Sequence, residues 1–115
     1  MRRGDIFLVD LSPTANGMSE HTRPAVLVSN DAANRTAERT GRGIVTVVPL
    51  THNTSQVYPF QVFVAAGEGE LGARSKAHAE QLRSVDCRRL GRRLGALKPA
   101  TLRHLDEALR THLAL

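Results

Sequence analysis

Two stretches decide the fold: Arg23-Pro24-Ala25-Val26-Leu27-Val28-Ser29-Asn30-Asp31 and Val47-Val48-Pro49-Leu50-Thr51-His52-Asn53-Thr54. Each is an apolar, β-branched run that ends in polar side chains, which is typical of a strand leading into a loop. A strand holds such groups rigidly, as a reactive site requires. The first stretch presents the guanidinium of Arg23, whose planar fork of donors suits phosphate. The second presents Thr51, His52 and Asn53, so together they predict a site that stabilises or cleaves a phosphodiester.

The balance of charge favours an anionic partner. The chain has 115 residues, a formal net charge of +5 and a pI of about 10.6. Arginine supplies most of the positive charge, because Lys76 and Lys98 are the only lysines. Nucleic acid is the usual partner of such a chain, although an ordinary solvated surface rich in arginine would give the same composition. The length predicts a single domain over residues 1–115.

The chain lacks the sequence patterns of disulfides, zinc sites and membrane spans. Cys87 is the only cysteine, so no intramolecular disulfide can form, and the histidines do not show zinc-ligand spacing. No apolar run approaches the length that crosses a bilayer. We expect a cytoplasmic protein with no metal, no cofactor and no membrane contact.

Short apolar runs predict strands over residues 6–9, 24–29, 44–50 and 60–66. Asn30-Asp31 can cap a short helix through residues 32–34. The pattern leaves two segments open. Residues 77–85 alternate with period 2 but contain poor strand formers, and residues 88–97 fit either a strand or a basic helix.

The C-terminal segment predicts a helix. Pro99 suits a first turn, and Leu102, Leu105, Leu109 and Leu113 recur at helical spacing. Oppositely charged residues at positions 103 and 107, and at 106 and 110, are placed to pair at i, i+4. Several short antiparallel strands closed by one helix predict an α+β fold built on a small barrel.

A series of short motifs, in order along the whole chain, resembles the MazF/PemK toxins. The motifs are Arg3-Gly4-Asp5-Ile6, Ser12-Pro13, Ser19-Glu20 before Arg23-Pro24, Val28-Ser29-Asn30-Asp31, Pro49-Leu50-Thr51 and Glu80-Gln81-Leu82-Arg83-Ser84-Val85-Asp86. The resemblance implies an SH3-like antiparallel barrel with short helices and a C-terminal α-helix, in which residues 77–83 form a strand.

The same resemblance implies the toxin of a type II toxin–antitoxin system. Such a protein is a homodimeric, ribosome-independent and metal-independent endoribonuclease that cuts single-stranded RNA at specific sequences. Its products carry 2′,3′-cyclic phosphate and 5′-hydroxyl ends, and RNA cleavage inhibits translation and growth. A cognate MazE-like antitoxin would inhibit it through an extended acidic segment.

The resemblance places the catalytic pair on Arg23 and Thr51. It places the acidic residue of the first long loop on Glu20, and an RNA-contacting amide on Gln81. We include the polar residues of the same motifs as further candidates for RNA binding: His21, Ser29, Asn30, His52, Asn53 and Arg83. His21, Thr22 and Met18 depart from the family pattern in the loop that shapes the RNA site.

The chemistry needs a proton acceptor for the 2′-hydroxyl, donors for the phosphorane and a proton for the leaving oxygen. Arg23 suits the second role but is a poor free acid or base, because its pKa lies far above neutrality. His52 titrates in the right range, yet adjacent residues of an extended segment point to opposite faces. We therefore expect Arg23 rather than His52 to take part in proton transfer. We expect His78, His104 and His112 to be surface or packing residues.

Two further groups of residues have alternative interpretations. Arg88, Arg89, Arg92 and Arg93 form either a phosphate-tracking patch or a solvated face. Phe7, Phe60 and Phe63 are expected in the core rather than on a stacking platform. The competing functions are a CcdB-like gyrase-binding toxin, disfavoured because the chain has no Trp, and a non-catalytic RNA-binding barrel.

Overall fold

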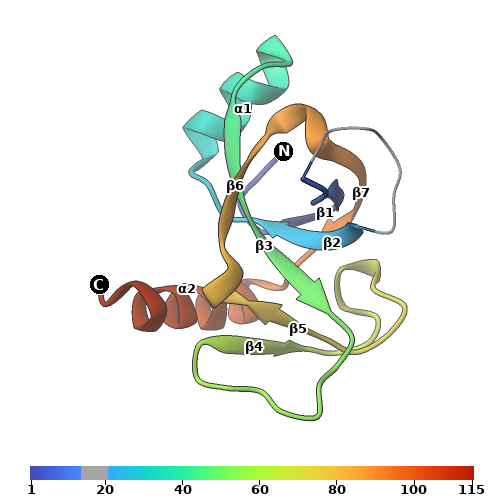
Figure 1. Ribbon diagram of the computed structural model, residues 1–115, viewed down its shortest axis with the longest axis vertical. Helices are drawn as coiled ribbons and strands as arrows, with labels where there is room; N and C mark the ends of the chain where they lie inside the picture. Colours follow the sequence, from blue (N-terminus) through green and yellow to red (C-terminus); the bar gives the residue numbers. More distant parts are fainter. Residues whose placement is uncertain (14–20) are drawn as a thin grey trace.

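The computed structural model describes residues 1–13 and 21–115, and within these residues the chain forms an antiparallel sheet and two α-helices (Figure 1). The strands are β1 (Asp5–Asp10), β2 (Thr22–Leu27), β3 (Ile44–Thr51), β4 (Gln61–Val64), β5 (Ser75–His78), β6 (Arg83–Asp86) and β7 (Leu90–Ala96). The helices are α1 (Asp31–Thr40) and α2 (Pro99–Leu113), with short 3₁₀ turns η1 (Glu68–Glu70), η2 (Ala79–Gln81) and η3 (Cys87–Arg89). This is the predicted α+β fold, a small antiparallel barrel with a C-terminal helix.

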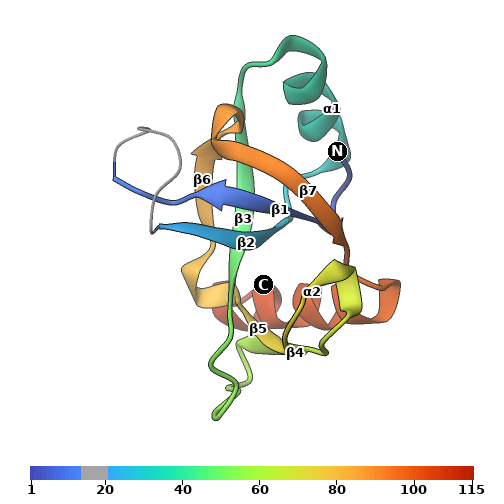
Figure 2. The ribbon, with the colours of Figure 1, turned by 90° about the vertical axis from the view of Figure 1, so that its right-hand side faces the viewer.

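Strand β3 is the centre of the sheet. The strand order is β4-β5-β3-β2-β1-β7, and β6 also pairs with β3, so β3 contacts three other strands. β2 lies along one edge of β3, while β5 and β6 share the other edge in succession. The sheet bends strongly as a result, and α1 and α2 lie at opposite ends of it (Figure 2).

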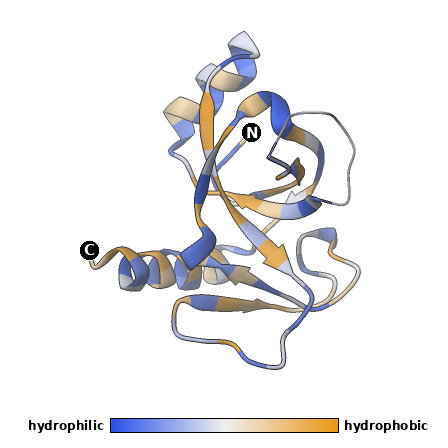
Figure 3. Cartoon of the chain, viewed as in Figure 1, coloured by the Kyte–Doolittle hydropathy of each residue, from blue (hydrophilic) through white to orange (hydrophobic). Residues whose placement is uncertain are grey.

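The two faces of β3 build two separate cores. Val48 and Leu50 pack in a cluster that includes Leu105 and Leu109 of α2. Val45 and Val47 point the other way, into a cluster that includes Ala37 of α1. Because alternate side chains of a strand point to opposite faces, a strand buried on both faces is apolar along most of its length, and β3 is largely orange in Figure 3.

Helix α1 extends beyond the predicted short helix of residues 32–34. It begins where the side-chain oxygen of Asn30 accepts a hydrogen bond from the backbone N–H of Ala33, at 2.8 Å. It ends at Gly41, which adopts the left-handed conformation with φ 69° that favours glycine. The cap was predicted, but the length of the helix depends on Gly41, eleven residues after the cap.

Helix α2 starts at Pro99 as predicted, with a different set of contacts. Leu105 and Leu109 are buried with Ala108, while Leu113 is 46% exposed. The i, i+4 pairs predicted on its surface are replaced by an Arg110–Glu107 pair at i, i+3. Asp106 instead pairs with Arg3 near the N-terminus. α2 therefore covers one core and also anchors the start of the chain.

The strand implied over residues 77–83 was wrong, because turn η2 interrupts it. β5 pairs Ala77 with Leu50, and β6 pairs Arg83 with Val47. Six steps along the chain from 77 to 83 thus match three steps along β3 from 50 to 47, and the surplus of three residues is η2. The other open segment, residues 88–97, contains strand β7.

Two glycines meet where turn η1 crosses β7. A Cβ on Gly95 would lie 2.5 Å from the carbonyl oxygen of Gly69 and 2.6 Å from its carbonyl carbon. Both atoms are backbone, so neither can rotate away. Residue 95 must therefore be glycine for η1 to pack against the sheet.

We predict that Gly95→Ala destabilises the protein by about 1–3 kcal/mol, because the added methyl group overpacks a backbone contact. That loss corresponds to a fall in Tm on the order of 5–20 °C, measurable by calorimetry. Gly72→Ala is the matched control, since a Cβ there meets nothing within 4 Å. Equal Tm values for the two variants would contradict the packing argument.

Candidate active site

Arg23 and Thr51 lie on neighbouring strands, Arg23 at the start of β2 and Thr51 at the end of β3. The strands are antiparallel, with Ala25 opposite Pro49. The same register carried two residues further sets Arg23 level with Thr51, and residues at opposed positions share a face of the sheet. Extended in this way, the register sets the predicted pair on one face of the sheet.

The same face continues onto β5 and β4. Thr51 is opposite Lys76 on β5, and the next residue of β5 on that face is His78. His78 is in turn opposite Gln61 on β4, and Lys76 is opposite Phe63. Arg23 and Thr51 therefore lie on the same face as three polar side chains, from Lys76, His78 and Gln61.

Thr51 forms its closest side-chain contact with His78. The Thr51 hydroxyl oxygen lies 2.7 Å from Nε2 of the imidazole, which is a short hydrogen bond. His78 is 8% exposed. Its other ring nitrogen, Nδ1, lies 3.3 Å from Nε2 of Gln61 and 3.4 Å from Oε1 of Glu80. The imidazole therefore lies between the hydroxyl and a carboxylate.

The surroundings of His78 lower its pKa from the ordinary value near 6.5. Burial is the main cause, because it disfavours the imidazolium. The ammonium of Lys76 acts in the same direction, and the carboxylate of Glu80 opposes both. The ring is consequently neutral at pH 7 and able to accept a proton.

Sequence reasoning missed His78, which we expected to be a surface or packing residue. The contact joins residues 27 apart in the chain and depends on the β3–β5 register. A lone histidine in a strand gives no signal of that partner. A strand that begins before residue 77, as β5 does, puts Lys76 and His78 on one face, and that alternation is the signal that would have suggested a polar face.

The residues after Thr51 turn away from it. His52 is exposed, and its Nδ1 lies 3.4 Å from the Ser75 hydroxyl rather than near Thr51. The side-chain oxygen of Asn53 accepts hydrogen bonds from the backbone N–H and the hydroxyl of Ser55, at 3.2 and 2.8 Å. Asn53 thereby stabilises the loop, and its RNA contact stays a prediction, as does that of His52.

The remaining candidates divide between the two ends of β3. Gln81 in η2 and Arg83 at the start of β6 are both exposed on the strand edge beside β3. Arg83 approaches the carbonyl of Leu11, whose N–H donates to the carbonyl of His21, so Arg83 and His21 lie at the same loop base. Glu20 lies outside the described residues.

Ser29 and Asn30 lie at the opposite end, where β2 leads into α1. The Ser29 hydroxyl donates to Asn34, and it accepts from the backbone N–H of Thr46. Asn30 caps α1. Thr46 and Thr51 are separated by most of β3, so the structure does not bring Ser29 and Asn30 to Thr51. Their binding of RNA stays a prediction.

The arginine cluster is largely committed to acceptors within the protein. Arg88 forms two hydrogen bonds with the carboxylate of Asp86, at 3.0 and 2.8 Å. Arg89 donates to the carbonyls of Asp10 and Ser12, and Arg93 pairs with the buried Asp5. These contacts favour the solvated structural face over a phosphate-tracking patch.

The aromatic side chains do not all enter the core. Phe7 is buried, but Phe63 is 49% exposed, so its expected core position was wrong. Tyr58 and Phe60 stack with ring centroids 5.4 Å apart, and Tyr58 is 46% exposed. Phe60, which was also expected in the core, is only half-buried before β4 begins. Phe63 lies on the face of β4 opposite to Val62 and Val64, which pack in the core.

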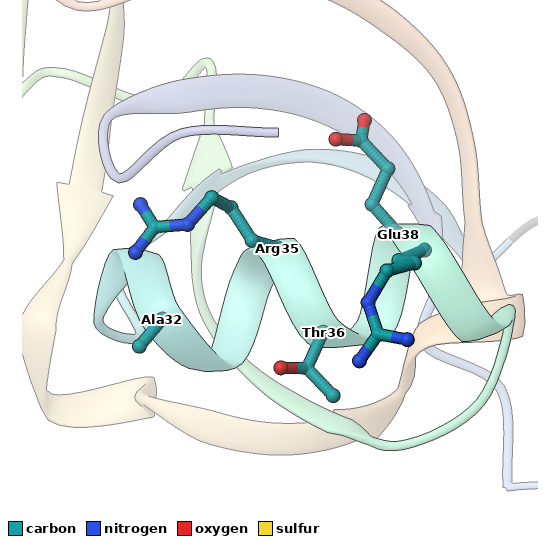
Figure 4. A pocket seen from close by; sticks show the side chains of 5 residues that line it. Ala32, Arg35, Thr36 and Glu38 are labelled. Carbon is teal, nitrogen blue, oxygen red and sulfur yellow. The ribbon is translucent and has the colours of Figure 1, made fainter.

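A shallow hollow lies on the exposed side of α1, away from the candidate active site (Figure 4). It is lined by Ala32, Arg35, Thr36, Glu38 and Arg39. None of the predicted site residues lines it.

Residues 1–13 and 21–115 contain no group of three or more His, Cys, Asp or Glu side chains arranged to hold a metal ion. None of the helices in the described part of the chain has the length and hydropathy needed to cross a membrane.

Comparisons with known proteins agree over nearly the whole chain. Residues 2–113 match the family described as PemK-like, MazF-like toxin of type II toxin-antitoxin system. The chain is 52% identical to Endoribonuclease MazF9 of Mycobacterium tuberculosis over 115 residues, which covers 100% of this chain and 98% of that protein. It is 49% identical to Probable endoribonuclease MazF1 of the same organism over 74 residues, 64% of this chain and 78% of that protein.

Solved structures share the fold. A mycobacterial endoribonuclease in complex with its cognate antitoxin superposes with a TM-score of 0.78 at 27% identity, covering 100% of this chain and 96% of that one. MazF from Deinococcus radiodurans gives a TM-score of 0.77 at 25% identity, covering 100% and 97% of the two chains.

We predict that Arg88→Ala raises the pKa of Asp86 from about 2 toward its ordinary value of 3.8, because the guanidinium is the main cause of the depression. A carbon-detected NMR titration of the carboxyl group measures the change. The pKa should stay below 3.8, since the backbone N–H of residue 88 still donates to Asp86. An unchanged pKa would show that Arg88 is not committed to this carboxylate.

Proposed function

Because the chain belongs to the PemK-like, MazF-like toxin family of type II toxin–antitoxin systems, we propose that it is an endoribonuclease that cleaves single-stranded RNA at specific sequences. Cleavage of messenger RNA, and of ribosomal or transfer RNA where the sequence occurs, would inhibit translation and growth. The 52% identity to an endoribonuclease over the full chain favours this activity over gyrase binding and over a barrel without catalysis.

The observation that carries the proposal is the register of β2 and β3, which, extended by two residues from the Ala25–Pro49 pair, sets Arg23 level with Thr51 on one face of the sheet. The guanidinium of Arg23 donates two parallel hydrogen bonds to the scissile phosphate and stabilises the negative charge of the phosphorane. The hydroxyl of Thr51 contacts the sugar or a phosphate oxygen beside it. The products would be a 2′,3′-cyclic phosphate and a 5′-hydroxyl.

Residues around this pair bind the RNA strand. Gln81 and Arg83 flank β3 on the η2 and β6 side, and His21 and Glu20 belong to the loop between β1 and β2. His52 and Asn53 follow Thr51, and Ser29 and Asn30 would contact RNA that extends toward α1. Amide and carbonyl groups would read the bases, while Arg23 and Arg83 would bind phosphate.

We place the protein in the cytoplasm as a homodimer of one-domain chains, with residues 1–115 as the toxin domain. Its partners are single-stranded RNA and a MazE-like antitoxin whose extended acidic segment would occupy the face that binds RNA. The antitoxin complex of a structural relative supports this assignment. The formal net charge of +5 suits both anionic partners.

We predict that Arg23→Ala and Thr51→Ala each lose at least about 10²-fold in cleavage rate while the fold is retained. Arg23→Lys should fail as well, because a point charge cannot reproduce two parallel hydrogen bonds to phosphate. The assay is cleavage of a long RNA in EDTA with mapping of the ends. Arg42→Lys, the same change at an exposed position beyond α1, is the matched control and should cleave normally.

Three outcomes would contradict parts of this proposal. Binding of RNA without cleavage by the wild-type protein would support a non-catalytic barrel. Cleavage that disappears in EDTA would exclude the metal-independent mechanism. Normal rates in Arg23→Lys would exclude the bidentate role of Arg23.

We predict that an acidic peptide with apolar anchors competes with RNA for the protein, and that added salt weakens both complexes. Fluorescence anisotropy at several salt concentrations measures the two affinities. An affinity for the peptide that does not change with salt would show that charge contributes little to antitoxin binding.

A further inference from the structure

Glu80, His78 and Thr51 form a line of hydrogen-bonding groups that ends at the proposed catalytic hydroxyl. The Thr51 oxygen lies 2.7 Å from Nε2 of His78, and Nδ1 of His78 lies 3.4 Å from Oε1 of Glu80. The order carboxylate, imidazole, hydroxyl is the one that activates hydroxyl groups in many hydrolases. The hydroxyl here belongs to a residue that the proposed function already places beside the RNA.

The amide of Gln61 fixes the carboxylate in this line. Its side-chain oxygen accepts a hydrogen bond from the backbone N–H of Tyr58 at 3.2 Å, which sets the orientation of the amide. Its nitrogen then donates to Oε2 of Glu80 at 2.7 Å. Oε1 of Glu80 is the oxygen left to face His78.

Two groups compete for Nδ1 of His78: the amide nitrogen of Gln61, which can only donate, at 3.3 Å, and Oε1 of Glu80, which can only accept, at 3.4 Å. The Gln61 nitrogen already donates to Oε2 of Glu80, so the need of Oε1 for a donor decides the position of the proton. Within the described residues, Oε1 of Glu80 is buried and has no hydrogen-bond partner. A buried carboxylate oxygen without a donor is costly, and the nearby Nδ1 of His78 can supply one if it carries the proton. With the proton on Nδ1, Nε2 has a free lone pair and accepts the hydroxyl proton of Thr51.

We propose that His78 is a positioning residue for RNA cleavage. Its Nε2 accepts a hydrogen bond from the Thr51 hydroxyl, orients that hydroxyl and receives its proton during the reaction. The inference rests on the proposed function. As the 2′-oxygen bonds to phosphorus, its proton passes to the Thr51 oxygen, whose own proton passes to Nε2 of His78. The P–O5′ bond breaks with its electron pair on the 5′ oxygen, which takes a proton from water. His78 then returns its proton to solvent.

The charged groups around His78 set the direction of the pH dependence. Burial and Lys76 of β5 lower the pKa of the imidazole, and Glu80 in η2 raises it; the net effect is a lowered pKa. Gln61 of β4 and Thr51 of β3 are uncharged. The face that α2 packs against this region is apolar, with Leu105, Ala108 and Leu109. The neutral, accepting form of His78 therefore persists to a pH below 6.5 and is lost on further acidification.

The first test is the pH profile of kcat for cleavage in EDTA. The wild-type rate should rise with pH and level off below pH 6.5. His78→Gln should lose about 10²-fold in kcat with little change in KM, and its profile should be flat over the same range. Thr51→Ser, which keeps the hydroxyl, should retain the rise. Glu80→Gln should move the midpoint to lower pH, because the carboxylate that raises the pKa is removed.

Controls separate this role from a structural one. His104→Gln, an exposed histidine on α2, should keep the wild-type profile. A His78→Gln protein that keeps the wild-type rate and the acid limb would overturn the proposal. So would a protein with a uniformly lower rate and an unchanged profile, because that pattern indicates lost packing alone.

The second test does not depend on cleavage. Nitrogen-15 NMR of labelled histidine identifies the protonated ring nitrogen, and His78 should carry its proton on Nδ1 with a pKa below 6.5. A proton on Nε2 would overturn the proposal. If the wild-type protein does not cleave RNA, both the proposed function and the role of His78 are wrong. If the wild type cleaves and His78→Gln cleaves at the same rate, only the role of His78 is wrong.

Discussion

Burial of β3 on both of its faces is the constraint on which the rest of the structure depends. Val48 and Leu50 fill the core under α2, and Val45 and Val47 fill the core beside α1. Because both faces of β3 are covered and the strand pairs with β2, β5 and β6, it has little freedom, and at its end Thr51 is still paired with Lys76 of β5. The site benefits directly, since Thr51 is the last residue of that strand and inherits its rigidity.

The sequence was sufficient for most strands and for the start of α2, because these depend on local patterns. The apolar runs and Pro99 act over a few residues. The catalytic roles of Arg23 and Thr51 stay a prediction. The sequence was insufficient for η2, because the three-residue surplus is defined only against the register of β3. His78 was missed for the same reason, and Phe63 was misplaced because nothing in its strand indicates which face lacks a cover.

The arginine cluster shows why composition alone is a poor guide to binding. Arg88, Arg89 and Arg93 give the densest run of positive charge, yet each has an acceptor in the protein. Their role is to hold η3, β7 and the start of the long loop in place. The cationic surface relevant to an anionic partner is therefore smaller than the formal charge of the chain indicates.

Turn η2 directs two neighbouring side chains into different surroundings. Oε1 of Glu80 is buried beside His78, while Gln81 is exposed beside β3. Under the proposed function, one residue governs proton handling and the next governs which bases are read. Mutational drift in this turn would alter both properties together, so target preference and turnover could not evolve independently. Relatives that acquire a new target sequence through η2 would need compensating changes around the imidazole.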